Sequence, residues 1–198
     1  MWIKVCGMTS AEAVAAAMEA GADAIGFVFA PSVRRQTPEL AAQLAAPARG
    51  RLRLVAVTQH PEPELWRAVA SAFQPDILQT DLQDFATLPQ PLGRETLPVI
   101  RADQVLPEKV PVQLLYEGAR SGTGQVPDWA IAARWARRTR LVLAGGLHAG
   151  NVAEAIATVR PWGVDTSSGV EVAPGEKSPQ KIYEFVRAAR AAFGELPR

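Results

Sequence analysis

Residues 140–169 read RLVLAGGLHAGNVAEAIATVRPWGVDTSSG, and this stretch decides the fold class. It opens with the aliphatic run Arg140–Ala144, continues through a helical pattern over Asn151–Thr158 and closes with a second short run, Gly163–Thr166. Two such strands joined through a helix are expected to pair in parallel with a right-handed crossover. The stretch therefore predicts a strand–helix–strand unit with a small, glycine-bearing loop after each strand.

The same alternation extends along the whole chain. Predicted strands are Trp2–Cys6, Ala24–Phe29, Leu52–Val57, Asp76–Gln79, Pro98–Arg101, Val112–Glu117, Arg140–Ala144 and Gly163–Thr166, and predicted helices are Ala11–Ala20, Pro38–Ala46, Pro63–Ala72, Asp128–Arg137, Asn151–Thr158 and Pro179–Phe193. The segments Leu82–Leu88 and Gln104–Pro107 are too short for more than a helical turn. Eight strands that alternate with helices favour a closed barrel over an open sheet. We therefore predict an α/β fold, a single-domain (β/α)8 TIM barrel over residues 1–198 with one or two short or degenerate helices.

The composition bounds the partners of the chain. Lys+Arg number 21 and Asp+Glu 20, a balance that attracts neither nucleic acid nor a membrane surface. The alanine-rich stretch 11–24 is interrupted by glycine and acidic residues, so it does not predict a membrane span, and the N-terminus lacks the pattern of a signal peptide. A cytoplasmic location is expected.

Cysteine and histidine are scarce. Cys6 is the single cysteine and has no partner for an internal disulfide, and His60 and His148 are too few for a convincing zinc site. We therefore expect neither a metal nor a cofactor.

Two loops are candidates for phosphate binding. In this barrel fold the active site lies at the carboxyl ends of the strands, and the loops after strands seven and eight commonly bind phosphate. Here those loops are Ala144–Leu147 and Asp165–Gly169, whose small residues let backbone N–H groups approach phosphate oxygens closely. One Gly-Gly pair would more often be a simple turn, so the prediction depends on finding both loops. The predicted phosphate-binding residues are Gly145, Gly146, Ser167, Ser168 and Gly169.

Strand alternation indicates which side chains reach the barrel mouth, because alternate residues of a barrel strand face the interior. In the first strand Lys4 faces inward and Cys6 is the last inward residue. The same alternation makes Glu117 the last inward residue of the sixth strand and turns Asp165 inward from the eighth. Ile3, Val5, Val112, Leu114 and Tyr116 are predicted to face the helices, and Gln79 and Asp81 to face the interior.

A thiol, a carboxyl group and a phosphate site at one mouth suit proton transfer on a sugar phosphate. The thiol must ionise to act as a base, and we expect the positive charge of Lys4 to lower its pKa. Glu117 must instead stay protonated, through desolvation or a neighbouring carboxylate. Taken alone, however, a cysteine in an apolar strand is more often an inert core residue, and a carboxylate at a strand end is more often a cap or an ion-pair partner.

A series of motifs resembles the phosphoribosylanthranilate isomerases of tryptophan biosynthesis. They are Lys4-Val5-Cys6-Gly7-Met8-Thr9, Gly21-Ala22-Asp23 with Gly26-Phe27-Val28-Phe29, Ser32-Val33-Arg34, Gly122-Thr123-Gly124-Gln125 with Asp128-Trp129, Ala144-Gly145-Gly146-Leu147 with Asn151-Val152, Gly163-Val164-Asp165 to Ser167-Ser168-Gly169-Val170-Glu171, and Pro174-Gly175-Glu176-Lys177 with Lys181-Ile182. Each motif alone is weak, but together they follow one order over almost the full chain.

The resemblance implies a (β/α)8 fold and an Amadori rearrangement of N-(5-phosphoribosyl)anthranilate to 1-(2-carboxyphenylamino)-1-deoxyribulose 5-phosphate. By resemblance, Cys6 is the general base that takes the proton from C2 of the ribose, and an acidic residue at the end of strand six protonates the ring oxygen. Arg34 matches an arginine that can pair with the anthranilate carboxylate. Asp165 matches a substrate-contacting aspartate, and we place Lys4 with these two as a substrate-binding residue.

The chain departs from the family pattern at two strand ends. Where the family has Leu-Leu-Asp, this chain has Leu114-Leu115-Tyr116-Glu117. Counting back from the Gly122-Thr123-Gly124 motif places the acid at Glu117, in agreement with the alternation, with Tyr116 as the alternative. Asp81 replaces the histidine of the family's Gln-Leu-His-Gly, so no role of that histidine is transferred. Asp81 could instead keep Glu117 protonated by repulsion between like charges.

Two other interpretations remain open at this point. The related histidine-pathway aminoaldose isomerase performs the same rearrangement with a pair of aspartates, and Cys6 at the end of the first strand argues against it. A barrel that has lost catalysis would bind phosphate ligands without turnover. The expected partner is a small-molecule substrate, with no nucleic acid or membrane, and the sequence is compatible with a monomer or a homodimer.

Overall fold

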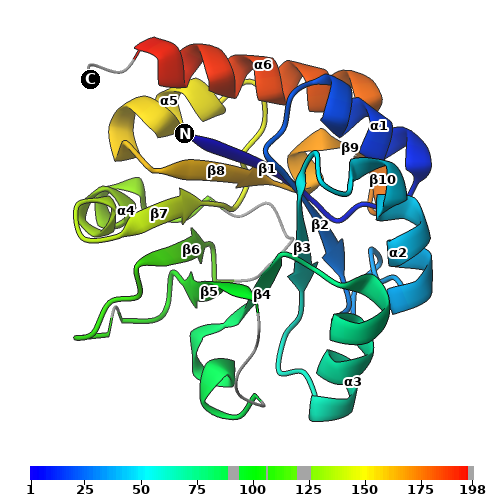
Figure 1. Ribbon diagram of the computed structural model, residues 1–198. Coiled ribbons are helices and arrows are strands. Elements are labelled where there is room, and N and C mark those ends of the chain that lie inside the picture. The colour runs from blue at the N-terminus through cyan, green and yellow to red at the C-terminus, as the bar shows by residue number, and fades with distance from the viewer. Residues whose placement is uncertain (89–93, 106, 120–125, 196–198) are drawn as a thin grey trace.

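The computed structural model describes residues 1–88, 94–105, 107–119 and 126–195, and its centre is a closed barrel of eight parallel strands (Figure 1). The strands are β1 (Trp2–Cys6), β2 (Ala24–Val28), β3 (Arg53–Val57), β4 (Ile77–Asp81), β5 (Glu95–Arg101), β6 (Gln113–Glu117), β7 (Arg140–Leu143) and β8 (Gly163–Thr166). Each strand pairs with the next along the chain, and β8 pairs with β1 to close the barrel. The predicted fold is confirmed.

Helices surround the barrel. They are α1 (Ala11–Glu19), α2 (Pro38–Ala45), α3 (Pro63–Ala68, continued by a π-helical segment, Val69–Phe73), α4 (Trp129–Ala136), α5 (Val152–Val159) and α6 (Pro179–Glu195). The side chains of Ser10, Thr37 and Asp128 accept hydrogen bonds from backbone N–H groups in the first turns of α1, α2 and α4, which explains where these helices begin. None of the described helices combines the length and the apolar character needed to span a bilayer.

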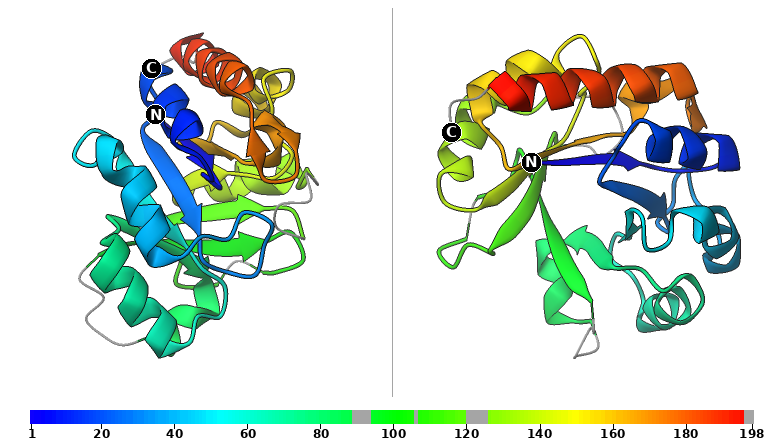
Figure 2. Two further views of the ribbon diagram at one scale, coloured as in Figure 1. Left: turned by 90° about the vertical axis from the view of Figure 1, so that its right-hand side faces the viewer. Right: turned by 45° about the horizontal axis from the view of Figure 1, so that its top comes forward.

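The helical layer is uneven around the barrel. The long helix α6 lies beside α1 and α5 and covers the β8–β1 side (Figure 2). On the opposite side, β4 is followed by a single 3-10 helix, Leu82–Ala86, and the described residues between β5 and β6 form no helix. These are the degenerate helices that the short segments predicted.

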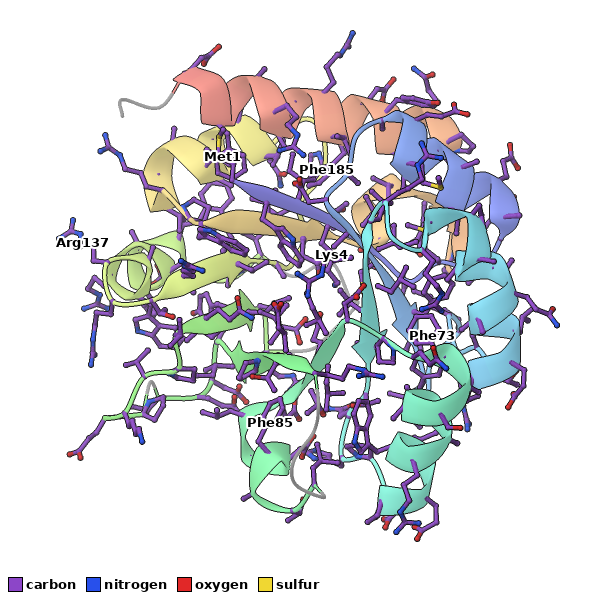
Figure 3. All side chains as sticks on the ribbon, viewed as in Figure 1. Met1, Lys4, Phe73, Phe85, Arg137 and Phe185 are labelled. Atoms are coloured by element: carbon purple, nitrogen blue, oxygen red, sulfur yellow. The ribbon has the colours of Figure 1, made fainter. Side chains whose placement is uncertain are left out.

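Apolar side chains form two layers, as strand alternation predicts. Ile3, Val5, Leu114 and Tyr116 are buried between the barrel and the helices. The barrel interior is packed by Trp2, Ala24, Val55, Ile77, Leu97, Val99, Leu115, Val142 and Ala144. Figure 3 shows Phe73 and Phe185 between strands and helices, whereas Lys4 points into the barrel. The interior is therefore a packed core that also holds a few buried polar side chains, among them Lys4, Gln79 and Asp165.

Two features differ from the sequence-based expectation. Val112 is 80% exposed and does not face the helices, because β6 begins one residue later. A small antiparallel hairpin of β9 (Glu171–Ala173) and β10 (Glu176–Lys177) follows β8 and was not predicted. Its strands have three and two residues, too few for a periodic pattern. The hairpin nevertheless matters, because it supplies two charged residues of the site.

Candidate active site

A buried ion pair links the two strands that close the barrel. The register of β1 and β8 pairs Lys4 with Asp165, so both side chains face the interior. Lys4 Nζ lies 2.9 Å from Asp165 Oδ1, and the Lys4 side chain is 0% exposed. Burial by itself would lower the pKa of Lys4, but the charges of Asp165 and Cys6 raise it. Lys4 thus supplies a fixed positive charge below the mouth of the barrel.

Cys6 ends β1 one side-chain repeat above Lys4 and lines the main pocket of the barrel mouth. On the neighbouring strand, a Cβ at Gly26 would lie 2.9 Å from Cys6 Sγ and 3.0 Å from Lys4 Cε, so glycine there leaves room for both side chains. Burial raises the pKa of the Cys6 thiol, and Asp165 adds to this, whereas Lys4 and Lys177 lower it by less. Lys4 therefore lowers the thiol pKa, as expected, but burial outweighs it and leaves the pKa of Cys6 raised.

Arg34 is held by the β9–β10 hairpin. Its Nε and Nη2 each lie 2.7 Å from a carboxylate oxygen of Glu171, a bidentate pair, and Lys177 Nζ lies 2.7 Å from Glu171 Oε1. Burial alone would raise the pKa of Glu171, but the hydrogen bonds from Arg34 and Lys177 lower it to about 2. Glu171 binds the Nε–Nη2 edge of the guanidinium, and Arg34 also lines the main pocket.

Glu171 and Lys177 were not assigned roles from the sequence. Both occur in the family-like motifs, at the end of Ser167–Glu171 and in Pro174–Lys177, and that is the one signal that could have found them. Lys177 Nζ also donates to the backbone oxygen of Ser167 at 2.9 Å, so the hairpin is tied to the loop after β8.

The two predicted phosphate loops lie side by side and enclose a second, smaller pocket. Gly145 and Gly146 have φ values of 91° and 63°, a backbone conformation that favours glycine. A Cβ at Gly169 would lie 2.0 Å from the backbone oxygen of Leu147, so only glycine allows the loops to approach this closely. The lining consists of Glu117, Asp165, Thr166 and the loop residues Ala144, Gly145, Gly146, Leu147, Ser167, Ser168 and Gly169. All five residues predicted for phosphate binding are brought together here.

Glu117 faces the mouth from the end of β6, across the barrel from Cys6. It lines both pockets, and its Oε1 lies 3.5 Å from Nε of Arg101 on β5. Tyr116, the alternative acid, is fully buried on the helix side with its ring 4.6 Å from that of Trp135. Of the two candidates for the acid, Glu117 is therefore the one that a ligand in the mouth can reach.

The side chain of Arg101 lies between Asp81 and Glu117, an arrangement that the sequence did not predict. Arg101 Nη1 lies 2.5 Å from Asp81 Oδ1, so the guanidinium bridges the two carboxylates. Repulsion of Glu117 by Asp81 stays a prediction, and the structure adds that a cation lies between the two carboxylates.

The two pockets are continuous at three shared residues. Glu117, Asp165 and Ser167 line both of them, and Cys6, Arg34 and Arg101 line the larger one. A ligand with an anionic end in the glycine-bearing pocket would therefore extend past Asp165 toward the thiol, the carboxyl group and a guanidinium. The motif Gly122-Thr123-Gly124-Gln125 lies outside the described residues.

One group of described side chains has the spacing of a metal site. His60, Asp81 and Asp84 each offer a ligand atom within 4.8 Å of the others. Their atoms are already engaged: His60 Nδ1 lies 2.7 Å from Asp84 Oδ1, Thr80 donates to Asp84, and Asp81 pairs with Arg101. The group is best described as a hydrogen-bonded network on the β4 side of the mouth.

Comparison with known proteins gives one consistent family. The sequence model described as N-(5'phosphoribosyl)anthranilate (PRA) isomerase matches residues 3–188. The N-(5'-phosphoribosyl)anthranilate isomerase of Azorhizobium caulinodans is 40% identical over 209 residues, covering 96% of this chain and 92% of that protein.

Solved structures agree. The phosphoribosyl anthranilate isomerase of Thermotoga maritima has a TM-score of 0.83 at 31% identity, covering 96% of this chain and 99% of that one. A phosphoribosyl anthranilate isomerase in complex with reduced 1-(o-carboxyphenylamino)-1-deoxyribulose 5-phosphate has a TM-score of 0.80 at 31% identity, with the same coverage.

Proposed function

This chain belongs to the N-(5'-phosphoribosyl)anthranilate (PRA) isomerase family, and from that premise we propose how its own residues divide the reaction. The protein is an isomerase of tryptophan biosynthesis that converts N-(5'-phosphoribosyl)anthranilate into 1-(2-carboxyphenylamino)-1-deoxyribulose 5-phosphate. Cys6 acts as general base, Glu117 as general acid, and the loops after β7 and β8 bind the phosphate.

The acid acts first. Glu117 lies at the junction of the two pockets, where the ribose of a substrate with its phosphate in the smaller pocket would lie. Its protonated carboxyl group gives a proton to the furanose ring oxygen, and the ring opens to an imine between C1 and the anthranilate nitrogen. Proton donation of this kind contributes about 10²–10⁴-fold to a rate.

The base completes the rearrangement. Ring opening leaves the imine protonated on nitrogen. The Cys6 thiolate takes the proton from C2, the electron pair of that C–H bond forms a C1–C2 double bond, and the C=N electron pair moves to the nitrogen, which becomes a neutral amine. The resulting enol becomes the ketone when C1 gains a proton and the C2 hydroxyl loses one. Because burial raises the thiol pKa, the thiolate is a minor form in the free protein, and the lysine charges of Lys4 and Lys177 act in its favour.

Three residues orient the substrate. The Nη1–Nη2 end of Arg34 receives the anthranilate carboxylate, while Glu171 fixes the rest of its guanidinium. Asp165 accepts a hydrogen bond from a ribose hydroxyl, and the ion pair with Lys4 holds the Asp165 side chain in place. Burial raises the pKa of Asp165, and the charge of Lys4 acts against this rise. The N–H groups near Gly145, Gly146 and Ser167–Gly169 bind the phosphate.

The observation that carries this proposal is that both pockets meet at Glu117 and Asp165, and that Cys6 lines the larger pocket from β1, the strand beside that of Asp165. The test is a fluorescence assay that follows the loss of phosphoribosylanthranilate after addition of purified protein. Turnover that saturates with substrate supports the proposal. Binding of the reduced product analogue without turnover would instead identify a barrel that has lost catalysis.

The location of the enzyme follows from the same chemistry. A base made from the single cysteine requires a free thiol, which a reducing compartment preserves, and we therefore propose that the protein works in the cytoplasm.

A further inference from the structure

Three charged side chains lie in a row at the carboxyl ends of β4, β5 and β6. The register pairs Arg101 directly with Glu117, and Asp81 ends the strand on the other side of β5. Arg101 Nη1 is 2.5 Å from Asp81 Oδ1, and Arg101 Nε is 3.5 Å from Glu117 Oε1. One guanidinium thus contacts two carboxyl groups, and the shorter contact is to Asp81.

Asp81 is anchored from behind. Its side chain is 4% exposed, and Oδ2 lies 3.4 Å from Nε2 of His60. The other ring nitrogen of His60 lies 2.7 Å from Asp84, which also accepts a hydrogen bond from the backbone N–H of His60 at 2.9 Å. Asp84 further accepts a hydrogen bond from Thr80, so the end of β4 presents a carboxylate in a fixed position.

The pairing of Arg101 with Asp81 explains how Glu117 can stay protonated beside a cation. A general acid must carry its proton, yet an unbalanced cation about 4–6 Å away favours the ionised carboxylate and lowers a carboxyl pKa by about 1–3. A guanidinium beside Glu117 would therefore oppose the acid role. A second carboxylate that pairs more closely with the same guanidinium offsets its charge while leaving its N–H groups in place as donors.

We propose that Asp81 and Arg101 form a charge-compensated pair that positions the carboxyl group of Glu117 and allows it to keep its proton. The inference rests on the proposed function, because it assumes that Glu117 is the acid. It gives Asp81 an indirect role: the residue acts on Glu117 through Arg101. Both members of the pair are positioning residues, and the position where the family has a histidine becomes part of the acid side of the mouth.

Other charged groups face the same space and must be held constant in a test. Asp165, Cys6 and Arg34 line the larger pocket together with Glu117. Lys4 pairs with Asp165, and Glu171 pairs with Arg34. None of these is altered in the variants that test the pair, so a change in Glu117 can be assigned to Asp81 and Arg101.

The test is an NMR titration of protein labelled with ¹³C at the glutamate side-chain carboxyl carbons. The Glu117 signal is the one missing from the Glu117→Gln spectrum. Asp81→Asn removes the negative charge that offsets Arg101, so the pH at the midpoint of the Glu117 titration falls by about one unit or more. Arg101→Met removes the positive charge that offsets Asp81, so the midpoint of the Glu117 titration rises by a similar amount. The double variant returns close to the unaltered protein.

Kinetics separate positioning from charge. Arg101→Lys keeps the cation but loses the planar fork, so kcat should fall about 10-fold or more while the midpoint for Glu117 changes little. Asp103→Asn, an exposed carboxylate two residues beyond Arg101, is the matched control and should change neither quantity. Circular dichroism checks that each variant is folded, and if Asp81→Asn is unfolded, the sign of the shift in Arg101→Met decides alone.

Midpoints that stay unchanged in both single variants, or move in the same direction, would overturn the inference. Failure of the proposed function gives a different result, because the unaltered protein would then not turn over phosphoribosylanthranilate at all.

Discussion

On the β8–β1 side of the mouth, lysines and Arg34 contact their carboxylates in buried pairs. On the β4–β6 side, the guanidinium of Arg101 contacts two carboxylates. Lys4 pairs with Asp165, and Arg34 and Lys177 share Glu171. The first side lies under α6 and keeps the family motifs; the second has a 3-10 helix in place of one helix and departs from the family pattern at Asp81 and Glu117. The charges near Cys6, the proposed base, are thus fixed in buried ion pairs. The charges near Glu117, the proposed acid, are arranged so that they control whether this carboxyl group is protonated.

The difference matters because the proposed reaction needs Cys6 as a thiolate and Glu117 as a carboxylic acid at the same time. Burial raises the pKa of the Cys6 thiol, so the free protein holds a neutral thiol, while Glu117 contacts Arg101. The reactive combination of thiolate and carboxylic acid is therefore a minor state before substrate binds. Substitutions at Cys6 and at Glu117 in turn show which of the two groups limits the population of this state.

The largest effect is expected from removing the base. Cys6→Ala leaves no group to take the C2 proton, so turnover should fall below detection, while binding of the reduced product analogue stays near normal. Steady-state fluorescence and calorimetry measure the two quantities. Cys6→Ser, which keeps the side-chain volume without an easily ionised group, is the matched variant and should be equally inactive. Turnover that survives Cys6→Ala would refute the assignment of the base.

Removing the acid proton should have the next largest effect. Glu117→Gln keeps shape and removes the proton donor, so kcat should fall roughly 100-fold or more with a smaller change in KM. Tyr116→Phe is the control, because that hydroxyl lies on the helix side of β6 and its loss should leave kcat nearly unchanged. If Tyr116→Phe is the more damaging variant, the assignment of the acid is wrong.

A moderate effect is expected at the carboxylate end of the substrate. Arg34→Lys keeps a charge but cannot pair with Glu171 through two parallel hydrogen bonds. Losing a charge-assisted hydrogen bond worth about 1.5–3 kcal/mol should raise KM by about 10-fold or more and change kcat less. The check is to compare this substrate with an analogue that lacks the carboxylate. If Arg34→Lys raised KM equally for the substrate and for the analogue, recognition of the carboxylate by Arg34 would be contradicted.

The smallest effect concerns stability and its pH dependence. The pKa of Glu171 is lowered to about 2 in the folded protein, so its contribution to stability is present above the ordinary carboxyl range and is lost as the pH falls through the folded value. The gap in Tm between the unaltered protein and Glu171→Gln should be widest at neutral pH. It should narrow between about pH 5 and pH 2. A gap that stays constant over this range would show that the carboxylate is not ion-paired.

The fold and the inward positions on the β8–β1 side were predictable from the sequence for physical reasons. Period-two alternation decides which strand residues face inward, and this rule alone places Lys4, Cys6 and Asp165 inside the barrel. Gly169 was predictable as a phosphate-loop residue, although the close backbone contact with Leu147 that demands glycine could not be seen in the sequence.

The acid side was less predictable, since its interactions are long-range. Asp81 and Glu117 are far apart in sequence, and no pattern indicates that Arg101 lies between them. The lowering effect of Lys4 on the Cys6 pKa could be predicted, but the larger opposing effect of burial could not, because the sequence does not show how deeply the thiol is buried. The β9–β10 hairpin was missed because strands of two or three residues carry no periodic signal.

The most direct test of the division of labour is a crystal structure of this protein with the reduced product analogue bound. The account predicts the phosphate between the loops after β7 and β8 and Cys6 Sγ beside the carbon that derives from C2. It also places the Glu117 carboxyl group within about 2.6–3.2 Å of the hydroxyl that derives from the ring oxygen. An analogue bound with its phosphate elsewhere, or with either side chain directed away from the sugar, would contradict it.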